Sequence, residues 1–340
     1  MTITRLARAT AIAALFGGTA LAGTAFSAAA MAADWTMRIS HQWSPGLPTA
    51  KLLDGFEKTV EEKSGGRLDV QIFPAMQLYK ADQQHAAVAQ GLIEATVMPD
   101  FTMGGTVPEM VVSLIPFLVR DEASVRAFPS SKVAELLEEK LRARMVEPIG
   151  WTVESRSLLI TSNGRPLSEP EAFKGVKIRG LNPLYDKGLA ALGATPTAMP
   201  AAEIYQALQT GIIDATVTGT TGALGRKFYE VQEYGVVAPG ISFAKNVFLV
   251  NPGWWQDLPD DIRRIITDAT DEMWTTSVEA NLDPRADPAI EGLETAGMKM
   301  TVLDDAQSAA LAQVMAPPVM SAFSEMGRDA RRVVDLSRAE

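Results

Sequence analysis

The sequence predicts an α/β protein built from two similar α/β domains, with a cleft between them and a long bracing helix. The word GLIEATV at residues 91–97 returns as GIIDATV at residues 211–217. Each copy follows a helical stretch, begins at a Gly placed to end that helix, and continues into β-branched residues typical of a strand. The stretch 258–282 has apolar residues on one helical face and predicts the brace.

Residues 1–32 have the features of a secretory signal peptide. Arg5 and Arg8 precede an apolar, Ala-rich run, and Ala30-Met31-Ala32 has the small-x-small pattern at which such leaders are cleaved. A membrane anchor is the alternative for this stretch. No later run approaches the roughly 20 apolar residues that a membrane span needs. We therefore expect an exported, periplasmic protein beginning at Ala33, with no direct membrane insertion.

Composition excludes several classes of function. The chain has no cysteine, two histidines, and 41 acidic against 31 basic residues. The absence of cysteine excludes thiol chemistry, the presence of only two histidines disfavours the usual zinc sites, and the negative charge disfavours nucleic acid as a partner. The sequence has no G-x-S-x-G, H-E-x-x-H or phosphate-loop motif. We expect no catalytic residue, no metal and no cofactor.

The first half alternates strands and helices. TMRIS (36–40) predicts a strand, HQWSPGLPTA (41–50) a loop, KLLDGFEKTVEEKSGG (51–66) a helix, and RLDVQIF (67–73) a second strand; the first copy of the repeated word then supplies a helix and a strand through Val97. Such alternation favours a parallel sheet, whose strand ends bring their loops to one edge.

The second half begins after the connection SNGRPLSEPEAF (162–173). GVKIRG (175–180) predicts a strand, NPLYDKGLAALG (182–193) a helix, and TPTAMP (195–200) a short strand or turn; FAKNVFLVNP (243–252) predicts a strand that returns toward the first half. The resulting domains are 33–156 with about 245–284, and about 157–244 with 285–340. Hinge closure is expected at the crossing segments 155–161 and 244–250.

Arg179, near the carboxyl end of its strand, is the leading candidate for a ligand contact. A guanidinium presents a fixed fork of donors that matches a carboxylate, whereas most arginines are solvated surface groups. The loops PDF (99–101) and TGTT (218–221) should form two walls of one cleft.

The first-half wall offers polar and aromatic candidates. Gln42 can donate or accept hydrogen bonds, while Trp43 and Phe101 either stack on a ligand or pack in the core. If Asp100 lines the cleft, it favours a ligand that also carries an amine or hydroxyls. The acids of the repeated word, Glu94 and Asp214, are expected to cap or pair near strand starts.

Five segments carry a resemblance to a known family: FKGVKIRGLN (173–182), ALGATPTAMPAAEIYQALQTGIIDATV (191–217), KFYEVQEYG (227–235), GGRLDVQIFPAMQLYK (65–80) and SLIPFLVRD (113–121). They resemble the DctP-type solute-binding component of tripartite ATP-independent periplasmic (TRAP) transporters. The resemblance implies a periplasmic-binding-protein-like fold and a receptor that delivers a small organic acid to permease subunits driven by an ion gradient.

The resemblance also implies roles for single residues. Arg179 matches the arginine that clamps the ligand carboxylate, and Asn182 matches a family contact position. Arg156 is the nearest match to a second arginine, although its spacing to TSNGRP is about two residues too long. Thr218 stands where many relatives have a ligand-contacting Asn, so the far end of the ligand should be recognised differently.

Three alternatives remain open at the level of sequence. A periplasmic lyase or isomerase could bind a carboxylate through Arg179 and use His41 or Asp100 as a base. A receptor could present its ligand to a sensor kinase, and binding proteins of ATP-driven transporters share the architecture. The ligand itself could be a sugar acid, a dicarboxylate, an oxo acid or an aromatic acid.

Overall fold

The computed structural model describes residues 33–119 and 122–339. Ala33–Glu340 forms one compact unit, and the leader predicted at residues 1–32 lies outside the described residues. Among the helices described, none is long and apolar enough to cross a membrane.

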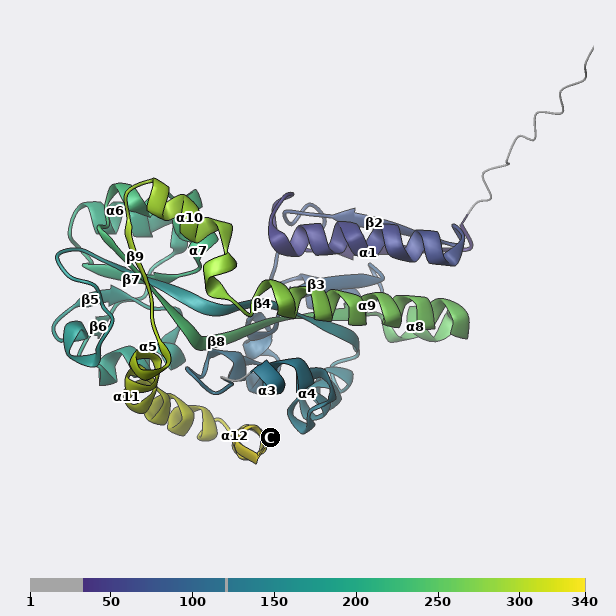
Figure 1. Ribbon diagram of the computed structural model, residues 1–340. Coiled ribbons are helices and arrows are strands. Elements are labelled where there is room, and N and C mark those ends of the chain that lie inside the picture. Colours follow the sequence, from purple (N-terminus) through teal and green to yellow (C-terminus); the bar gives the residue numbers. More distant parts are fainter. Residues whose placement is uncertain (1–32, 120–121, 340) are drawn as a thin grey trace, which may run out of the picture. The chain divides into compact units, whose positions relative to one another are not determined.

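The described residues form one mixed sheet of nine strands in the order β2-β1-β3-β8-β4-β7-β5-β6, with β9 paired to β8. The strands are β1 (Trp35–Ser40), β2 (Leu68–Phe73), β3 (Ala95–Pro99), β4 (Glu147–Ser162), β5 (Lys177–Arg179), β6 (Thr195–Pro196), β7 (Ala215–Thr218), β8 (Tyr234–Val250) and β9 (Lys299–Val302). Figure 1 shows β4 and β8 running the length of the sheet, from the end that carries α6, α7 and α10 to the end that carries α1 and α9.

Helices connect and cover these strands. They are α1 (Pro48–Ser64), α2 (Gln84–Ala89), α3 (Glu122–Ala127), α4 (Lys132–Arg142), α5 (Pro183–Ala191), α6 (Ile204–Gln209), α7 (Thr220–Gly225), α8 (Pro252–Asp257), α9 (Asp260–Ala280), α10 (Pro288–Thr295), α11 (Asp305–Ser324) and α12 (Arg328–Ala339). The predicted glycine stops are confirmed, because Gly65, Gly91 and Gly211 all have φ between 64° and 71°, in the left-handed region that glycine adopts without strain.

The expectation of a parallel sheet holds within each half and is wrong for the strands that join them. β1 pairs in parallel with β2 and β3, and β5 pairs in parallel with β6 and β7. β4 and β8 are antiparallel to each other, and they also pair antiparallel with β7 and β3 respectively. Each crossing strand therefore runs through both halves, and the sheet is continuous.

Side chains of β8 alternate between cores on opposite faces of the sheet. Val247 and Leu249 pack with residues of α2, α4 and β4, whereas Phe248 and Val250 pack with residues of α1 and α9. In the second half, the core on one face contains residues of α5 and α11, and the core on the other contains residues of α6 and α10. The sheet is thus covered on both faces, as near-continuous hydrophobic strands require.

The acids of the repeated word pair near strand starts, as the sequence predicts. Glu94 accepts hydrogen bonds from the backbone N–H of Arg38 at 3.0 Å and from its guanidinium at 2.7 Å. Asp214 accepts the backbone N–H of Lys177 at 2.9 Å, with the Lys177 ammonium at 4.0 Å. Each acid therefore ties its own strand to the neighbouring parallel strand.

We expect Glu94→Gln to lower the free energy of unfolding by about 1–2 kcal/mol, because it removes a charge-assisted pair whose carboxylate is mostly buried. Asp214→Asn should lower the free energy of unfolding by less than about 1 kcal/mol, since both Asp214 and Lys177 are about half exposed. Urea denaturation measures both, and equal losses would contradict the assignment.

Candidate ligand-binding site

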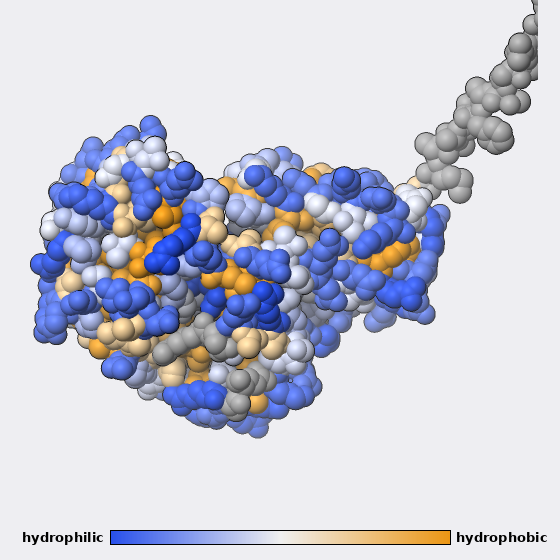
Figure 2. All heavy atoms as spheres, in the orientation of Figure 1, coloured by the Kyte–Doolittle hydropathy of each residue, from blue (hydrophilic) through white to orange (hydrophobic). Residues whose placement is uncertain are grey.

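Two sets of strand ends face the middle of the sheet. The loop after β1 carries Gln42 and Trp43, and β3 is followed by the 3-10 helix η1 (Asp100–Gly105), which carries Phe101. In the second half, β5 ends at Arg179 and β7 at Thr218. Figure 2 shows the surface hollowed between the end that carries α10 and the end that carries α1. Carboxyl ends of parallel strands are the common place for ligands in open α/β sheets.

The middle of β4 lies between the two sets of strand ends. Thr152 is level with the end of β3, because both Thr152 and Pro99 are paired with Asn246 of β8. Leu159 is paired with Thr218, the last residue of β7. The residues between carry two charged side chains, Glu154 and Arg156, and the register with β8 shifts on either side of Ser155.

Arg179 is half-buried and has no ion-pair partner within 4 Å among residues 33–119 and 122–339. Its Nη1 donates to the Val217 carbonyl at 3.3 Å. Burial lowers the pKa of Arg179, Asp186 opposes that effect, and Arg226 adds to it. An arginine keeps its charge in proteins, so Arg179 offers a partly desolvated cation at the strand ends.

Arg226 lies near Arg179 and next to Thr218, and sequence reasoning missed it. A Cβ placed on Gly222 would lie 2.7 Å from Arg226 Nη1 and 3.3 Å from Thr218 Oγ1, so both groups meet at this glycine. Arg226 Nη1 donates to the Gly222 carbonyl at 3.1 Å. A side chain at position 222 would push this cation away, and no pattern in the residues around 226 signalled the contact.

Asn182 caps helix α5. Its Oδ1 accepts hydrogen bonds from the backbone N–H groups of Leu184 and Tyr185, at 2.9 and 2.8 Å. These bonds satisfy two donors that the first turn of a helix otherwise leaves without partners. The side-chain oxygen of Asn182 therefore orients the helix that follows Arg179.

On the first-half side, Trp43 contacts a glutamate that sequence reasoning missed. The indole Nε1 of Trp43 donates to Glu154 Oε1 at 3.2 Å. Glu154 Oε2 is out of contact with solvent and has no hydrogen-bond partner among the described residues. Burial, reinforced by the charge of Asp100 and opposed by the Trp43 bond, raises the pKa of Glu154 to about 7.

Asp100 is fully buried, and its charge is paired inside the protein. Lys245 Nζ lies 3.1 Å from Asp100 Oδ2, and the other oxygen accepts from Ser113 Oγ and from the backbone N–H of Phe101. Burial raises the pKa of Asp100 and lowers that of Lys245, and the attraction between them opposes both changes. The sequence predicts a role for Asp100 in ligand binding only if Asp100 lines the cleft, and in the structure its carboxylate is held in an internal pair with Lys245.

The remaining predicted residues lie around this group. Gln42 and Phe101 are half-buried, and Arg156 is 9% exposed. His41 is fully buried, its ring centroid lies 5.7 Å from that of Trp43, and its ring nitrogens have no hydrogen-bond partner among the described residues. The structure thus brings Trp43, Glu154, Asp100 and Lys245 together, and separately Arg179, Thr218 and Arg226.

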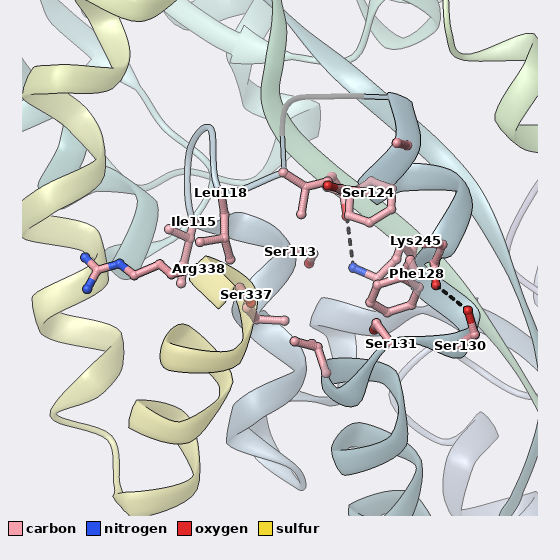
Figure 3. Close-up of a pocket in the computed structure, with 16 residues that line it drawn as sticks. Ser113, Ile115, Leu118, Ser124, Phe128, Ser130, Ser131, Lys245, Ser337 and Arg338 are labelled. Carbon is pink, nitrogen blue, oxygen red and sulfur yellow. Dashed lines mark hydrogen bonds between the residues drawn. The ribbon is translucent and has the colours of Figure 1, made fainter. Parts of the chain in front are cut away.

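A separate cavity of about 650 Å³ adjoins Lys245 in the first half. Figure 3 shows Lys245 beside Phe128, with Ser337 and Arg338 of α12 on the other side of the space. The ammonium lies 4.5 Å and 4.4 Å from the ring centroids of Phe128 and Phe243. Arg179 and Thr218 do not line this cavity.

The fold and these strand-end residues define a class: α/β receptors that hold a small ligand between two halves joined by crossing strands. A sequence model of bacterial extracellular solute-binding protein family 7 (DctP) matches residues 39–326. The chain belongs to this family, which is made of binding proteins.

Relatives cover nearly the whole chain. The C4-dicarboxylate-binding periplasmic protein DctP of Rhodobacter capsulatus is 28% identical over 335 residues, covering 96% of this chain and 98% of that protein. A TRAP periplasmic solute-binding protein from Desulfovibrio salexigens, solved with bound orotic acid, has 30% identity and a TM-score of 0.76 over 89% of this chain and 97% of its own. A similar protein from Rhodoferax ferrireducens, solved with malonate, has 25% identity and a TM-score of 0.78 over the same shares.

We expect Lys245→Met to lower the free energy of unfolding by about 3–5 kcal/mol, because Asp100 would keep a buried charge without its counterion. The double variant Lys245→Met with Asp100→Asn should recover most of this loss, since an amide can still accept from Ser113 and Phe101. Denaturant unfolding measures both, and a double variant as unstable as the single one would contradict the pairing.

The stability of the protein should also report the ionisation of Glu154. Folding raises its pKa from 4.5 to about 7, so the native state binds the extra proton and loses stability as the pH rises through this window. Between pH 5 and pH 8, the free energy of unfolding of the wild type should fall by about 2–3 kcal/mol more than that of Glu154→Gln. Unfolding curves of both proteins at the two pH values test this, and parallel pH profiles would contradict it.

Proposed function

We propose that this protein is the periplasmic receptor of a TRAP transporter, that it captures a small organic acid, and that it passes the acid to the permease subunits. One observation carries the proposal: Arg179 is a half-buried guanidinium at the strand ends with no acidic partner within 4 Å among the described residues. Such a cation favours a carboxylate in a two-bond arrangement.

The relatives also support an organic acid as the ligand. Their names and bound molecules include C4-dicarboxylates, malonate and orotic acid. Arg226, next to Thr218, adds positive charge on the same side and assists capture in a protein whose net charge is −10. Export through the leader at residues 1–32 places the receptor in the periplasm, and the bound acid is released unchanged.

Capture proceeds by closure of two domains, 33–156 with about 245–284 against about 157–244 with 285–340. Between the Ser155–Ala244 and Ser157–Pro239 pairs, β4 advances by two residues and β8 by five, so the ladder is interrupted where the halves join. Gly240 lies in this stretch with φ of 74°. Closure excludes water and strengthens the pairing of Arg179 with the acid.

Arg179→Ala should weaken binding of the acid by about 2–5 kcal/mol, and Arg179→Lys should also weaken it because an ammonium cannot reproduce the fork. A thermal-shift screen against dicarboxylates, sugar acids, 2-oxo acids and aromatic acids identifies the acid, and calorimetry then gives its affinity.

The matched control for this measurement is Arg165→Lys. Arg165 lies in the same half and donates to the Ala172 carbonyl on the surface. This control should leave the affinity unchanged. Wild-type affinity in Arg179→Lys, or conversion of the acid to a product, would overturn the proposal.

A further inference from the structure

Glu154 is an unusual residue to find between two sets of strand ends that receive an acid. It lies on β4 beyond the level of Pro99, where β3 ends, and before Leu159, which is paired with the last residue of β7. A second carboxylate in this gap would repel a ligand that carries negative charge at both ends. Glu154 therefore restricts which acids can bind.

The local contacts of Glu154 leave one oxygen for a ligand. The Trp43 indole donates to Oε1, and Glu154 has no salt bridge within 4 Å among residues 33–119 and 122–339. Oε2 is buried and accepts no hydrogen bond from those residues. An ionised carboxylate only accepts hydrogen bonds, so a donor at Oε2 would complete this site and would favour the ionised form over the protonated form that burial promotes.

The charges around Glu154 favour a cationic donor over a neutral one. Asp100 raises the cost of a negative charge on Glu154, and Lys245 is committed to Asp100 at 3.1 Å. His41 is buried beside Trp43, and burial lowers its pKa, so it is neutral near pH 7. A ligand cation would offset the desolvation of Glu154, whereas a hydroxyl would supply only a neutral hydrogen bond.

The distance between the two charges depends on closure. Arg179 is paired with Thr216 of β7, and Thr216 with Thr161 of β4, so Glu154 precedes the level of Arg179 by seven residue steps, about 23 Å of extended backbone. The bulges at Ser155 and the two long side chains shorten this span. In the proposed closed form, one small molecule bridges the two side chains.

Building on the proposed carboxylate clamp at Arg179, we propose that Glu154 selects zwitterionic ligands, with the carboxylate at Arg179 and a cationic nitrogen at Glu154 Oε2. Trp43 is then a positioning residue, because its indole N–H holds Oε1 and turns the other oxygen toward the ligand. The ligand class is an amino acid whose nitrogen lies at the end opposite its carboxylate.

Calorimetric titrations with linear probes of three to six carbons test this. At each length, the ω-amino acid is compared with the dicarboxylate of the same length. We expect at least one ω-amino acid to bind about tenfold or more tightly than its matched dicarboxylate. Glu154→Gln should abolish this preference by weakening the amino acid and leaving the dicarboxylate unchanged or tighter.

The matched control is Glu147→Gln, because Glu147 lies on the same strand and pairs with Arg142 at 2.9 Å away from the gap. It should keep the wild-type preference, and melting curves confirm that both variants fold. A wild type that prefers dicarboxylates at every length, a preference that survives Glu154→Gln, or no binding of any ω-amino acid would overturn the inference.

Arg179→Ala separates this inference from the proposed function. If Arg179→Ala binds no acid and the wild type shows no preference that depends on Glu154, the proposed carboxylate receptor stands. The selection of zwitterions by Glu154 is then rejected. Undiminished binding in Arg179→Ala would reject the clamp and, with it, the inference.

Discussion

The pairing of β4 with β8 is the constraint on which the rest of the structure depends. These two strands pass through both halves, and each half adds its parallel strands to them. Their register fixes how far the end of β3 lies from the end of β7. The interruption near Ser155 and Gly240 then lies between the halves, where few ladder bonds resist bending.

Charge is distributed unevenly around that interruption. On one side, Arg179 and Arg226 carry positive charges, and no carboxylate of the described residues lies within 4 Å of either guanidinium. On the other side, Asp100 and Lys245 neutralise each other in the core, and Glu154 remains as an acid held by Trp43. Because burial makes every unpaired charge costly, a ligand bound between these groups, as proposed above, would have to match this charge pattern.

Much of the fold could be predicted from local patterns. The repeated word predicted that helices end at Gly91 and Gly211, and that Glu94 and Asp214 each pair near the start of a strand. Both features depend on residues adjacent in sequence or on neighbouring strands. The length of β4 and the antiparallel direction of β4 and β8 could not be predicted. Strand direction depends on partners far away in the chain, and a run of apolar residues has no direction of its own.

The sequence by itself determined the family and the alternation of helices and strands, and it made Arg179 the leading candidate for a carboxylate contact, because each depends on a contiguous motif. Only the tertiary structure decided that Asp100 is neutralised by Lys245 and that Asn182 caps a helix. It also decided that Glu154 accepts a hydrogen bond from Trp43, which lies 111 residues away in the sequence. The physical reason is that burial and pairing set the state of a charge. Both are properties of groups that the fold brings together from distant parts of the chain.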